Sequence, residues 1–568
     1  MRTRSRWFPL LAPLLAPLLS LGLSAQARPV GDLGSQPSRG LVVSQERLAS
    51  EAGAAVLREG GSAVDAAVAT AFALAVVHPA AGNLGGGGFL LLRNAEGQAA
   101  FVDFRETAPA AAHPRMWLGA DGTYDGARHH DSLAAVGVPG TVAGLRRAWE
   151  REGRLPWARL LAPAIRLARE GFRLSENQAA SLAEQLPDFR KHAPTLAQFS
   201  RGGVPLRAGD RLVQRDLART LGRISKDWTD FYRGETARLI DRDMRAHGGL
   251  LRAADLRAYA PVLREPLRGT YRGLELLAAP PPSSGGQVLI QALNILEGYD
   301  LQAAGPGSPR ALHLAAEALR RAFADRAQFL GDPAFAPPIP LDRLLSKAHA
   351  AELRATIQPD QASASAPDRF TWPKDRPDTT HLSVLDDRGG AVSLTYTLEE
   401  SYGLRRIVPG AGFLLNNELG DFNAVPGLTD ATGRIGTAPN LARPGQRPLS
   451  SMCPVILVKD GRVHLVSGSP GGRTIPATVL NTVLGVVDFG LDARAAVDAP
   501  RLHHSWLPDR LQVEADLPAA TREALKALGH VLREVPRQGC AQVILVKDGR
   551  AQGAADTRRW PDSGAAWE

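Results

Sequence analysis

The spacing of apolar residues predicts helices over most of the first two thirds of the chain. Residues 44–58 have helical apolar spacing and end at a pair of glycines. The Ala-rich stretch that ends at Val77 is apolar nearly all round, so a buried helix is expected there. It follows Ser62–Asp65, which resembles a capping box. Residues 110–370 are mainly helical in pattern, including 315–330, with a turn-rich loop at 280–286.

Shorter apolar runs predict strands, chiefly in the last third of the chain. Residues 382–385 and 391–397 read as two strands joined by a turn at 386–390. Phe89–Leu92 forms another run, directly after four consecutive glycines. Such glycines permit close backbone approach. A phosphate-binding loop would require Gly-Lys-Ser/Thr leading into a helix, so nucleotide binding is rejected here.

One segment of eight residues occurs twice. Residues 455–462 recur identically at 543–550, each an apolar strand that enters an Asp-Gly turn. Two similar hairpins in one buried sheet explain this better than a duplicated domain. The two cysteines, Cys453 and Cys540, each precede one copy, so a bridge between them is conceivable if those strands are neighbours.

Composition limits the classes of function. With 568 residues and 44% hydrophobic content, length alone suggests roughly three or four domains, although one large two-part catalytic unit fits as well. Subtracting the three arginines of residues 1–27 from the formal charge of +9 leaves +6, spread along the chain. This argues against a dedicated nucleic-acid surface. The absence of CxxC and of ligand-spaced His/Cys groups argues against a structural zinc site.

Residues 1–27 have the three parts of a secretory signal. They comprise an arginine-containing start, an apolar run from Phe8 to Leu23 and the small-residue site Ala25-Gln26-Ala27. Cleavage there makes Arg28 the first residue of a mature protein outside the cytoplasm, in the periplasm or secreted. The alternative is that the segment remains as an uncleaved anchor.

Thr379 is the strongest candidate for chemistry. A threonine hydroxyl is a poor nucleophile unless a base accepts its proton. If the Asp378–Thr379 bond is cut, the new α-amino group, with an ordinary pKa of about 8, supplies that base on the same residue. The preceding Pro373–Pro377 segment reads as an exposed connector, consistent with a cleavage site. Taken alone, Thr379-Thr380 is explained better by the strand propensity of threonine.

Three further polar clusters lie directly before or after predicted strands. Residues 416–422 place two carboxylates three positions apart, and residues 447–452 contain a Ser-Ser pair. Residues 469–472 end in two glycines whose N–H groups suit a developing oxyanion.

Together these motifs resemble the γ-glutamyltranspeptidase family of self-cleaving N-terminal-nucleophile hydrolases, over nearly the whole mature chain. The motifs that carry the resemblance are Asp103–Glu106 with Ala108-Pro109, Pro139–Gly144, Ala324–Arg326, Thr379–His381, Pro448–Met452 and Gly468–Gly472.

The resemblance implies a role for each candidate residue. Thr379 is the cleavage residue and the nucleophile that forms a γ-glutamyl ester, and Thr397 orients it. Gly471 and Gly472 supply the oxyanion hole. The remaining assignments are Arg105, Ser450 and Ser451 for the substrate α-carboxylate, and Glu399, Glu418 and Asp421 for its α-ammonium.

The same resemblance implies the architecture and the partners. An α+β fold is expected, an αββα four-layer sandwich, cut between Asp378 and Thr379 into a large subunit (28–378) and a small subunit (379–568). The expected donors are glutathione or other γ-glutamyl compounds, and the acceptors are water, amino acids or peptides. No metal or organic cofactor is implied.

Departures and alternatives remain. Some family members carry amides where this chain has Glu399 and Glu418. The segment Pro426–Gln446 has the length of a family lid loop but no tyrosine, with Thr432 near the expected place, which predicts a leakier gate. Taken singly, Arg105 could pair structurally with Asp103 or Glu106.

The alternative functions are a glutaryl β-lactam acylase of the same architecture and a non-catalytic periplasmic binding protein for γ-glutamyl peptides.

Overall fold

A computed structural model describes residues 32–37, 40–365, 378–428 and 436–568. The predicted signal segment, the Pro373–Pro377 connector and Thr432 lie outside these residues. Within them, no helix combines the length and the apolar character that crossing a membrane requires.

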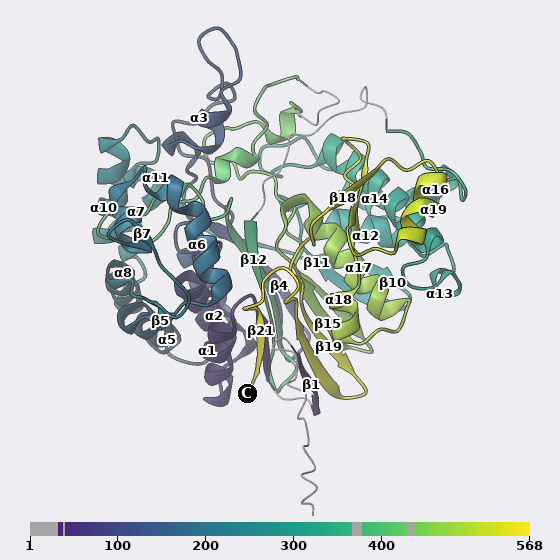
Figure 1. Cartoon of the computed structure of the whole chain (residues 1–568), viewed down its shortest axis with the longest axis horizontal. Helices are drawn as coiled ribbons and strands as arrows, with labels where there is room; N and C mark the ends of the chain where they lie inside the picture. The colour runs from purple at the N-terminus through teal and green to yellow at the C-terminus, as the bar shows by residue number, and fades with distance from the viewer. Residues whose placement is uncertain (1–31, 38–39, 366–377, 429–435) are drawn as a thin grey trace, which may run out of the picture.

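Two seven-stranded sheets form the centre of the molecule (Figure 1). The first sheet has the order β1 (Asp32–Pro37), β20 (Arg550–Ala555), β19 (Gln542–Lys547), β15 (Arg462–Gly468), β14 (Val455–Lys459), β11 (Leu274–Ala278), β10 (Leu267–Tyr271). The second has the order β21 (Gly564–Trp567), β2 (Leu41–Ser44), β12 (Asp378–Leu385), β13 (Ala391–Glu399), β3 (Gly87–Arg93), β4 (Ala99–Asp103), β9 (Val262–Arg264). Strands β12 and β13 contact β15 across the interface between the sheets.

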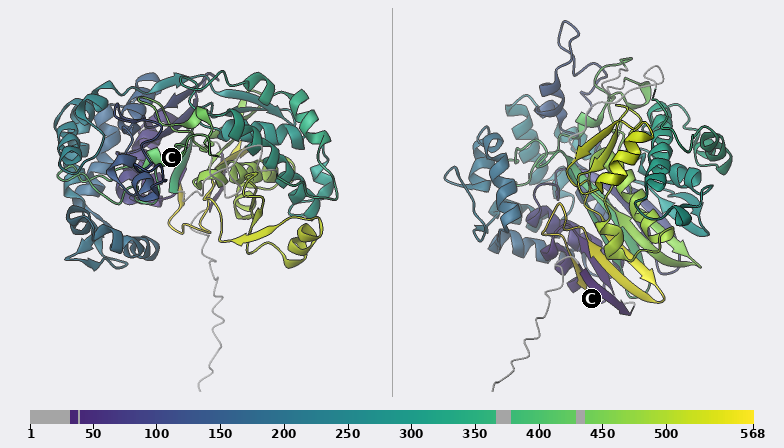
Figure 2. Two further views of the ribbon diagram at one scale, coloured as in Figure 1. Left: turned by 90° about the horizontal axis from the view of Figure 1, so that it is seen from above. Right: turned by 45° about the vertical axis from the view of Figure 1, so that its right-hand side comes forward.

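Helices cover the outer face of each sheet, so the predicted αββα sandwich is confirmed. The second sheet is covered by α2 (Ala63–Val77), which packs on β12 and β13, with α1 (Arg47–Arg58) beside it. The helices associated with the first sheet include α12 (Gly285–Leu296), α14 (Pro309–Phe329), α17 (Ile475–Val487) and α18 (Ala493–Asp498). The views of Figure 2 show the two helical groups on opposite sides of the strands.

Further helices surround this centre. On the side of α2 they are α3 (Gly126–His130), α4 (Thr141–Glu152), α5 (Trp157–Glu170), α6 (Glu176–Phe189), α7 (Ala193–Phe199), α8 (Arg215–Lys226), α9 (Asp230–Arg233), α10 (Glu235–Ala246) and α11 (Ala253–Ala258). On the side of α14 they are α13 (Leu301–Ala304), α15 (Leu341–Leu344), α16 (Lys347–Ala355) and α19 (Ala519–Ala527).

Local sequence signals located several of these elements. The Ser62 side chain accepts a hydrogen bond from the Asp65 N–H, which completes the predicted capping box, and every residue of α2 is buried. The helix predicted at 44–58 begins later, at Arg47, because the residues up to Ser44 form β2. The prediction of mainly helix for 110–370 missed the hairpin of β10 and β11. This hairpin joins the sheet through β11, whose partner strand β14 lies more than 170 positions away, with Val458 opposite Glu275.

The two copies of the repeated segment form two hairpins of one sheet, as predicted. Strands β14 and β15 form one hairpin and β19 and β20 the other, and the Asp-Gly turns have positive φ at both residues. However, β15 lies between β14 and β19, which separates those strands by about 10 Å. Disulfides require Cα atoms within about 7 Å. Cys453 and Cys540 are accordingly both free thiols, and no bridge joins them.

The glycine run at 85–88 brings β3 unusually close to β13. A Cβ at Gly88 would lie 2.3 Å from the Thr395 carbonyl oxygen, and one at Gly86 would lie 2.0 Å from that of Thr397. Such distances are too short for any side chain. The glycines therefore serve sheet packing beside Thr397, which agrees with the rejection of a phosphate loop.

We predict that Gly88→Ala destabilises the protein by about 1–3 kcal/mol, since the added methyl forces β3 away from β13. Gly222→Ala is the matched control, because Gly222 lies in α8 with no atom within 4 Å of the added Cβ. Alanine there is expected to be neutral or stabilising. Thermal unfolding of both variants checks this, and equal midpoints would show that the close approach has no energetic consequence.

Candidate functional site

A single cavity of about 330 Å³ collects nearly all the candidate residues. The candidates that line it are Arg105, Thr379, Thr397, Glu399, Glu418, Asp421, Ser450, Ser451 and Gly472. Gly471 is adjacent in the chain but does not line it, and the Asp378 side chain is outside the described residues. Side chains from both sides of the 378–379 bond therefore build one site.

Thr379 lies directly opposite Thr397 in the antiparallel pair of β12 and β13. Their hydroxyl oxygens are 3.4 Å apart, and both residues are at most 4% exposed. The register shifts between Asp378 and Thr379, so the ladder is irregular at this bond. The sheet consequently fixes the two hydroxyls at the edge of the cavity.

The strand that carries Thr397 ends in a left-handed residue. Glu399 has a φ of 82°, a conformation that is unfavourable for a residue with a side chain. It directs the Glu399 N–H back to the Thr397 Oγ1, at 2.9 Å. This hydrogen bond leaves the Thr397 hydroxyl oriented beside Thr379, and strained backbone of this kind is concentrated at functional sites.

Two glycines form the turn between β15 and α17. Gly471 and Gly472 have φ values of 132° and 53°, which favour glycine at both positions. Neither backbone N–H donates a hydrogen bond to another described residue. These N–H groups are therefore available to an anionic oxygen in or beside the cavity.

Arg105 is fully buried and pairs with carboxylates instead of presenting free donors. Its guanidinium contacts Glu418, and its Nη2 lies 2.5 Å from Asp421 Oδ2. The same side chain donates to the carbonyl oxygens of Pro448 and Leu449 at 3.3 and 3.4 Å. Burial lowers the pKa of Arg105, but Glu418 and the neighbouring acids outweigh this effect and raise it. The guanidinium thus remains a cation at the floor of the site.

The buried acids beside Arg105 hold protons more tightly than ordinary carboxyl groups. Burial raises the pKa of Glu106 and of Glu418, and attraction to Arg105 offsets this only in part. The Asp421 side chain, by contrast, is 29% exposed. Three acids around one guanidinium give this end of the cavity a negative character when all are ionised.

Several residues that line the cavity were not predicted from the sequence. These are Arg326, Arg473, Glu400, Asn423, Asn440 and His130. Arg326 belongs to a motif that carried the family resemblance, yet no role followed from it. It donates to the Ser451 hydroxyl at 2.9 Å. Spatial proximity to Ser451, 125 positions away, is not encoded in any local pattern.

His381, next to the candidate nucleophile, is not part of the cavity wall. Its ring is fully buried, with Nδ1 2.8 Å from the Thr395 hydroxyl and Nε2 3.2 Å from that of Ser383. Burial lowers its pKa to about 3, so the ring stays neutral. It fills space against Gly468, where a Cβ would lie 2.1 Å from the imidazole.

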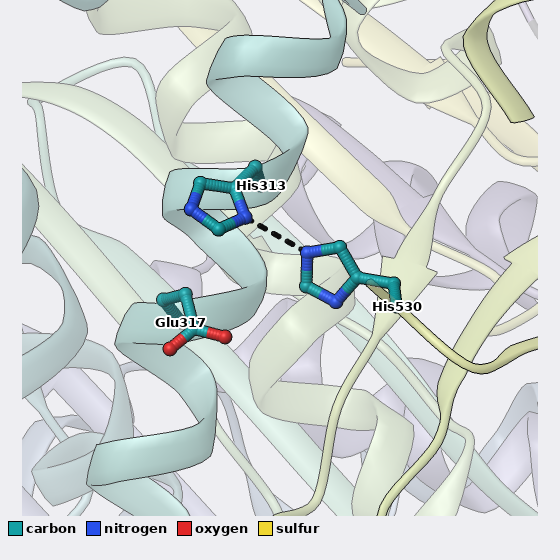
Figure 3. Close-up of side chains that lie close together, drawn as sticks. All are labelled: His313, Glu317 and His530. Carbon is teal, nitrogen blue, oxygen red and sulfur yellow. Dashed lines mark hydrogen bonds between the residues drawn. The ribbon is translucent and has the colours of Figure 1, made fainter. Parts of the chain in front are cut away.

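A second cluster of polar groups lies outside the cavity, between α14 and the segment before β18 (Leu532–Val535). His313 Nδ1 and His530 Nε2 are 2.8 Å apart and share a hydrogen bond, with Glu317 beside them (Figure 3). Arg320 and Arg321 already neutralise Glu317 at 3.1 and 2.6 Å. Because the carboxylate is paired twice, we interpret the cluster as a structural link across the 378–379 boundary and not as a metal centre.

The helix-covered double sheet, with a threonine at the start of a central strand facing a cavity, defines the class of N-terminal-nucleophile hydrolases. The gamma-glutamyltranspeptidase family model matches residues 49–566. The chain belongs to this family and is an enzyme.

Known relatives agree with this placement. The glutathione hydrolase proenzyme of Escherichia coli is 43% identical, covering 93% of this chain and 92% of its own. The Helicobacter pylori gamma-glutamyltranspeptidase structure is 43% identical, with a TM-score of 0.56 over 59% of this chain and 95% of its own. The cephalosporin acylase structure from Bacillus halodurans has a TM-score of 0.83 at 27% identity, covering 99% and 100%.

We predict that Glu106→Gln stabilises the protein more at pH 8 than at pH 5.5. A carboxyl group whose pKa is raised on folding favours the folded state at low pH, and this contribution is lost as the pH rises above its unfolded pKa of about 4.3. Glutamine does not ionise, so it removes that loss, about 1.4 kcal/mol for each unit of pKa difference.

Calorimetric unfolding of both proteins at the two pH values checks the sign. Glu150→Gln is the control, since Glu150 lies on the surface in an i,i+4 pair with Arg146. A stabilisation that is larger at pH 5.5 would contradict the assignment of a raised pKa to Glu106.

Proposed function

We propose that this chain is a self-processing γ-glutamyltransferase and glutathione hydrolase that acts through Thr379. The observation that carries the proposal is one cavity that combines a paired threonine hydroxyl, available backbone N–H groups nearby, and charged side chains of both signs. Its relatives are named as proenzymes, which supports processing of the precursor.

Self-cleavage comes first. The Thr379 hydroxyl attacks the Asp378 carbonyl carbon, the peptide nitrogen becomes a free amine, and water hydrolyses the resulting ester. The products are residues 28–378, after signal removal, and residues 379–568. Both sheets contain strands from both pieces, such as β2 beside β12 and β11 beside β14. The two subunits therefore stay associated as a heterodimer.

The catalytic cycle uses the same hydroxyl. The new α-amino group accepts the Thr379 proton while Oγ1 attacks the γ-carbonyl carbon of the donor, with Thr397 holding the hydroxyl in place. The Gly471 and Gly472 N–H groups stabilise the oxyanion, each worth about 3 kcal/mol of barrier. The leaving amine departs with the proton, and water or an acceptor amine then attacks the γ-glutamyl ester.

The charged side chains suit the head of a γ-glutamyl group. Glu399 and Asp421 are partly exposed to the cavity and offer carboxylates to the substrate ammonium. Ser450 and Ser451 offer hydroxyls to its carboxylate, with the Arg105 charge behind them. Glutathione, other γ-glutamyl compounds, and amino acid or peptide acceptors follow from this chemistry, in the periplasm or outside the cell.

A glutaryl β-lactam acylase is the second candidate, since a cephalosporin acylase shares the fold. A glutaryl group lacks the ammonium, yet five residues with carboxylate side chains line the cavity: Asp131, Glu399, Glu400, Glu418 and Asp421. Arg105 and Arg405 already pair with three of these acids, Glu418, Asp421 and Glu400. A second anion from a glutaryl donor therefore adds repulsion, whereas the ammonium of a γ-glutamyl donor offsets it, which favours the γ-glutamyl donor. The complete nucleophile arrangement likewise disfavours a non-catalytic binding protein.

We predict that the wild-type enzyme cleaves L-γ-glutamyl-p-nitroanilide at least about 100-fold more efficiently than glutaryl-p-nitroanilide, in kcat/KM. Glu399→Gln keeps the shape but removes one negative charge, so the γ-glutamyl substrate should lose about 10-fold and the glutaryl substrate much less. Glu150→Gln serves again as the surface control. Preference of the wild type for the glutaryl substrate would overturn the proposed function in favour of the acylase.

A further inference from the structure

The two serines of the cavity are both set up as hydrogen-bond donors to an anion. Ser450 Oγ accepts from the Met452 N–H at 3.1 Å, and Ser451 Oγ accepts from Arg326 Nη2 at 2.9 Å. Each hydroxyl has a single hydrogen, and among the described residues neither serine donates it to the protein. Both hydrogens therefore remain for an acceptor in the cavity that the serines line.

One buried guanidinium, that of Arg326, is hydrogen-bonded to Ser451 directly and to Ser450 through Ser284. Arg326, on α14 and 3% exposed, donates through Nε to Ser284 Oγ at 2.5 Å as well as through Nη2 to Ser451. Ser284 in turn binds the Ser450 carbonyl oxygen twice, from its hydroxyl at 2.7 Å and from its N–H at 2.8 Å. Arg326 thus holds Ser451 directly and the backbone of Ser450 through one intermediate.

Arg105 is already paired within the protein, so a second cation beside the serines matters for binding a carboxylate. Among the contacts of Arg105 are Glu418, Asp421 and two backbone carbonyls, so much of its charge and hydrogen-bonding capacity is already satisfied within the protein. Arg326 donates to the Ser284 and Ser451 hydroxyls and lines the same cavity as Ser450 and Ser451. A substrate carboxylate next to the two serines is therefore close to a second guanidinium.

We propose that Arg326 is a positioning residue for the α-carboxylate of the donor, a role that rests on the proposed function. It fixes the Ser451 hydroxyl as a donor, supports the Ser450 backbone through Ser284, and places a positive charge behind both. Arg326 acts through the serines and is not itself assigned contact with the substrate. Its loss should weaken recognition of the carboxylate and leave the chemical step nearly intact.

The test compares three p-nitroanilide substrates. L-γ-Glutamyl carries both charged groups, glutaryl carries only the carboxylate, and 4-aminobutanoyl carries only the ammonium. In Arg326→Gln, KM for the two carboxylate-bearing substrates should rise about 10-fold or more, with kcat changed less than about threefold. The 4-aminobutanoyl substrate should be unaffected in kcat/KM. Arg326→Lys, which keeps the charge, should recover part of the loss.

Arg321→Gln is the matched control, because Arg321 is on the same helix and forms partly buried hydrogen bonds with Glu317 outside the cavity. Ser284→Ala keeps the buried charge but breaks the link to Ser450, so it should show the same substrate pattern with a smaller effect. It also provides the test if Arg326→Gln does not fold. Intact mass first establishes that each variant has been cut to the same extent as the wild type.

Equal losses on all three substrates would show that Arg326 has only a structural role. Unchanged KM values would show that Arg326 does not contribute to carboxylate recognition. Failure of the proposed function has a different signature. In that case the wild type would prefer the glutaryl substrate, and the comparison of glutaryl with unsubstituted butanoyl anilide would still report on Arg326.

Discussion

The pairing of β12 with β13 is the constraint on which the site depends. It places Thr379 opposite Thr397, 3.4 Å apart between their hydroxyls, at the point where the ladder becomes irregular. Both strands are central in a seven-stranded sheet, covered by α2 on one side and by the first sheet on the other. The proposed nucleophile, Thr379, therefore lies on a central strand with packed neighbours, as precise catalytic geometry requires.

The close approach of β3 to β13 extends this constraint. At positions 86 and 88 there is no room for a side chain, so β3 packs closely against β13, which is paired with β12 on its other edge. Asn83 also binds the Thr397 carbonyl oxygen, at 2.8 Å. A loop that resembles a phosphate-binding loop in sequence thus fixes the backbone of Thr397, the residue proposed to orient the nucleophile.

Signals that are local in sequence predicted much of the fold. The capping box of Ser62, the Asp-Gly hairpins and the strands after Thr379 each follow from a few adjacent residues. The β10–β11 hairpin was missed, because it joins the sheet through the pairing of β11 with β14, far along the chain. The separation of Cys453 from Cys540 was not predictable for the same reason, because the sequence of a single strand does not determine which strands are its neighbours in the sheet.

The candidate site shows the same division. Motif resemblance identified Thr379, Thr397 and the Ser450–Ser451 pair, and the cavity brings them together. The pairing of Arg105 with Glu418 and the hydrogen bond from Arg326 to Ser451 were not predictable, because each joins segments more than 100 positions apart. Both contacts also join a residue before the 378–379 bond to one after it, so the site needs residues from both segments.

The most direct measurement is the intact mass of the purified protein, beside that of a Thr379→Ala variant. The account predicts two fragments in the wild type, with the second beginning at Thr379, and a single uncut chain in the variant. A wild-type chain that remains whole, or one that is cut at a different bond, would contradict it, because Thr379 would then lack the free amine that its chemistry requires.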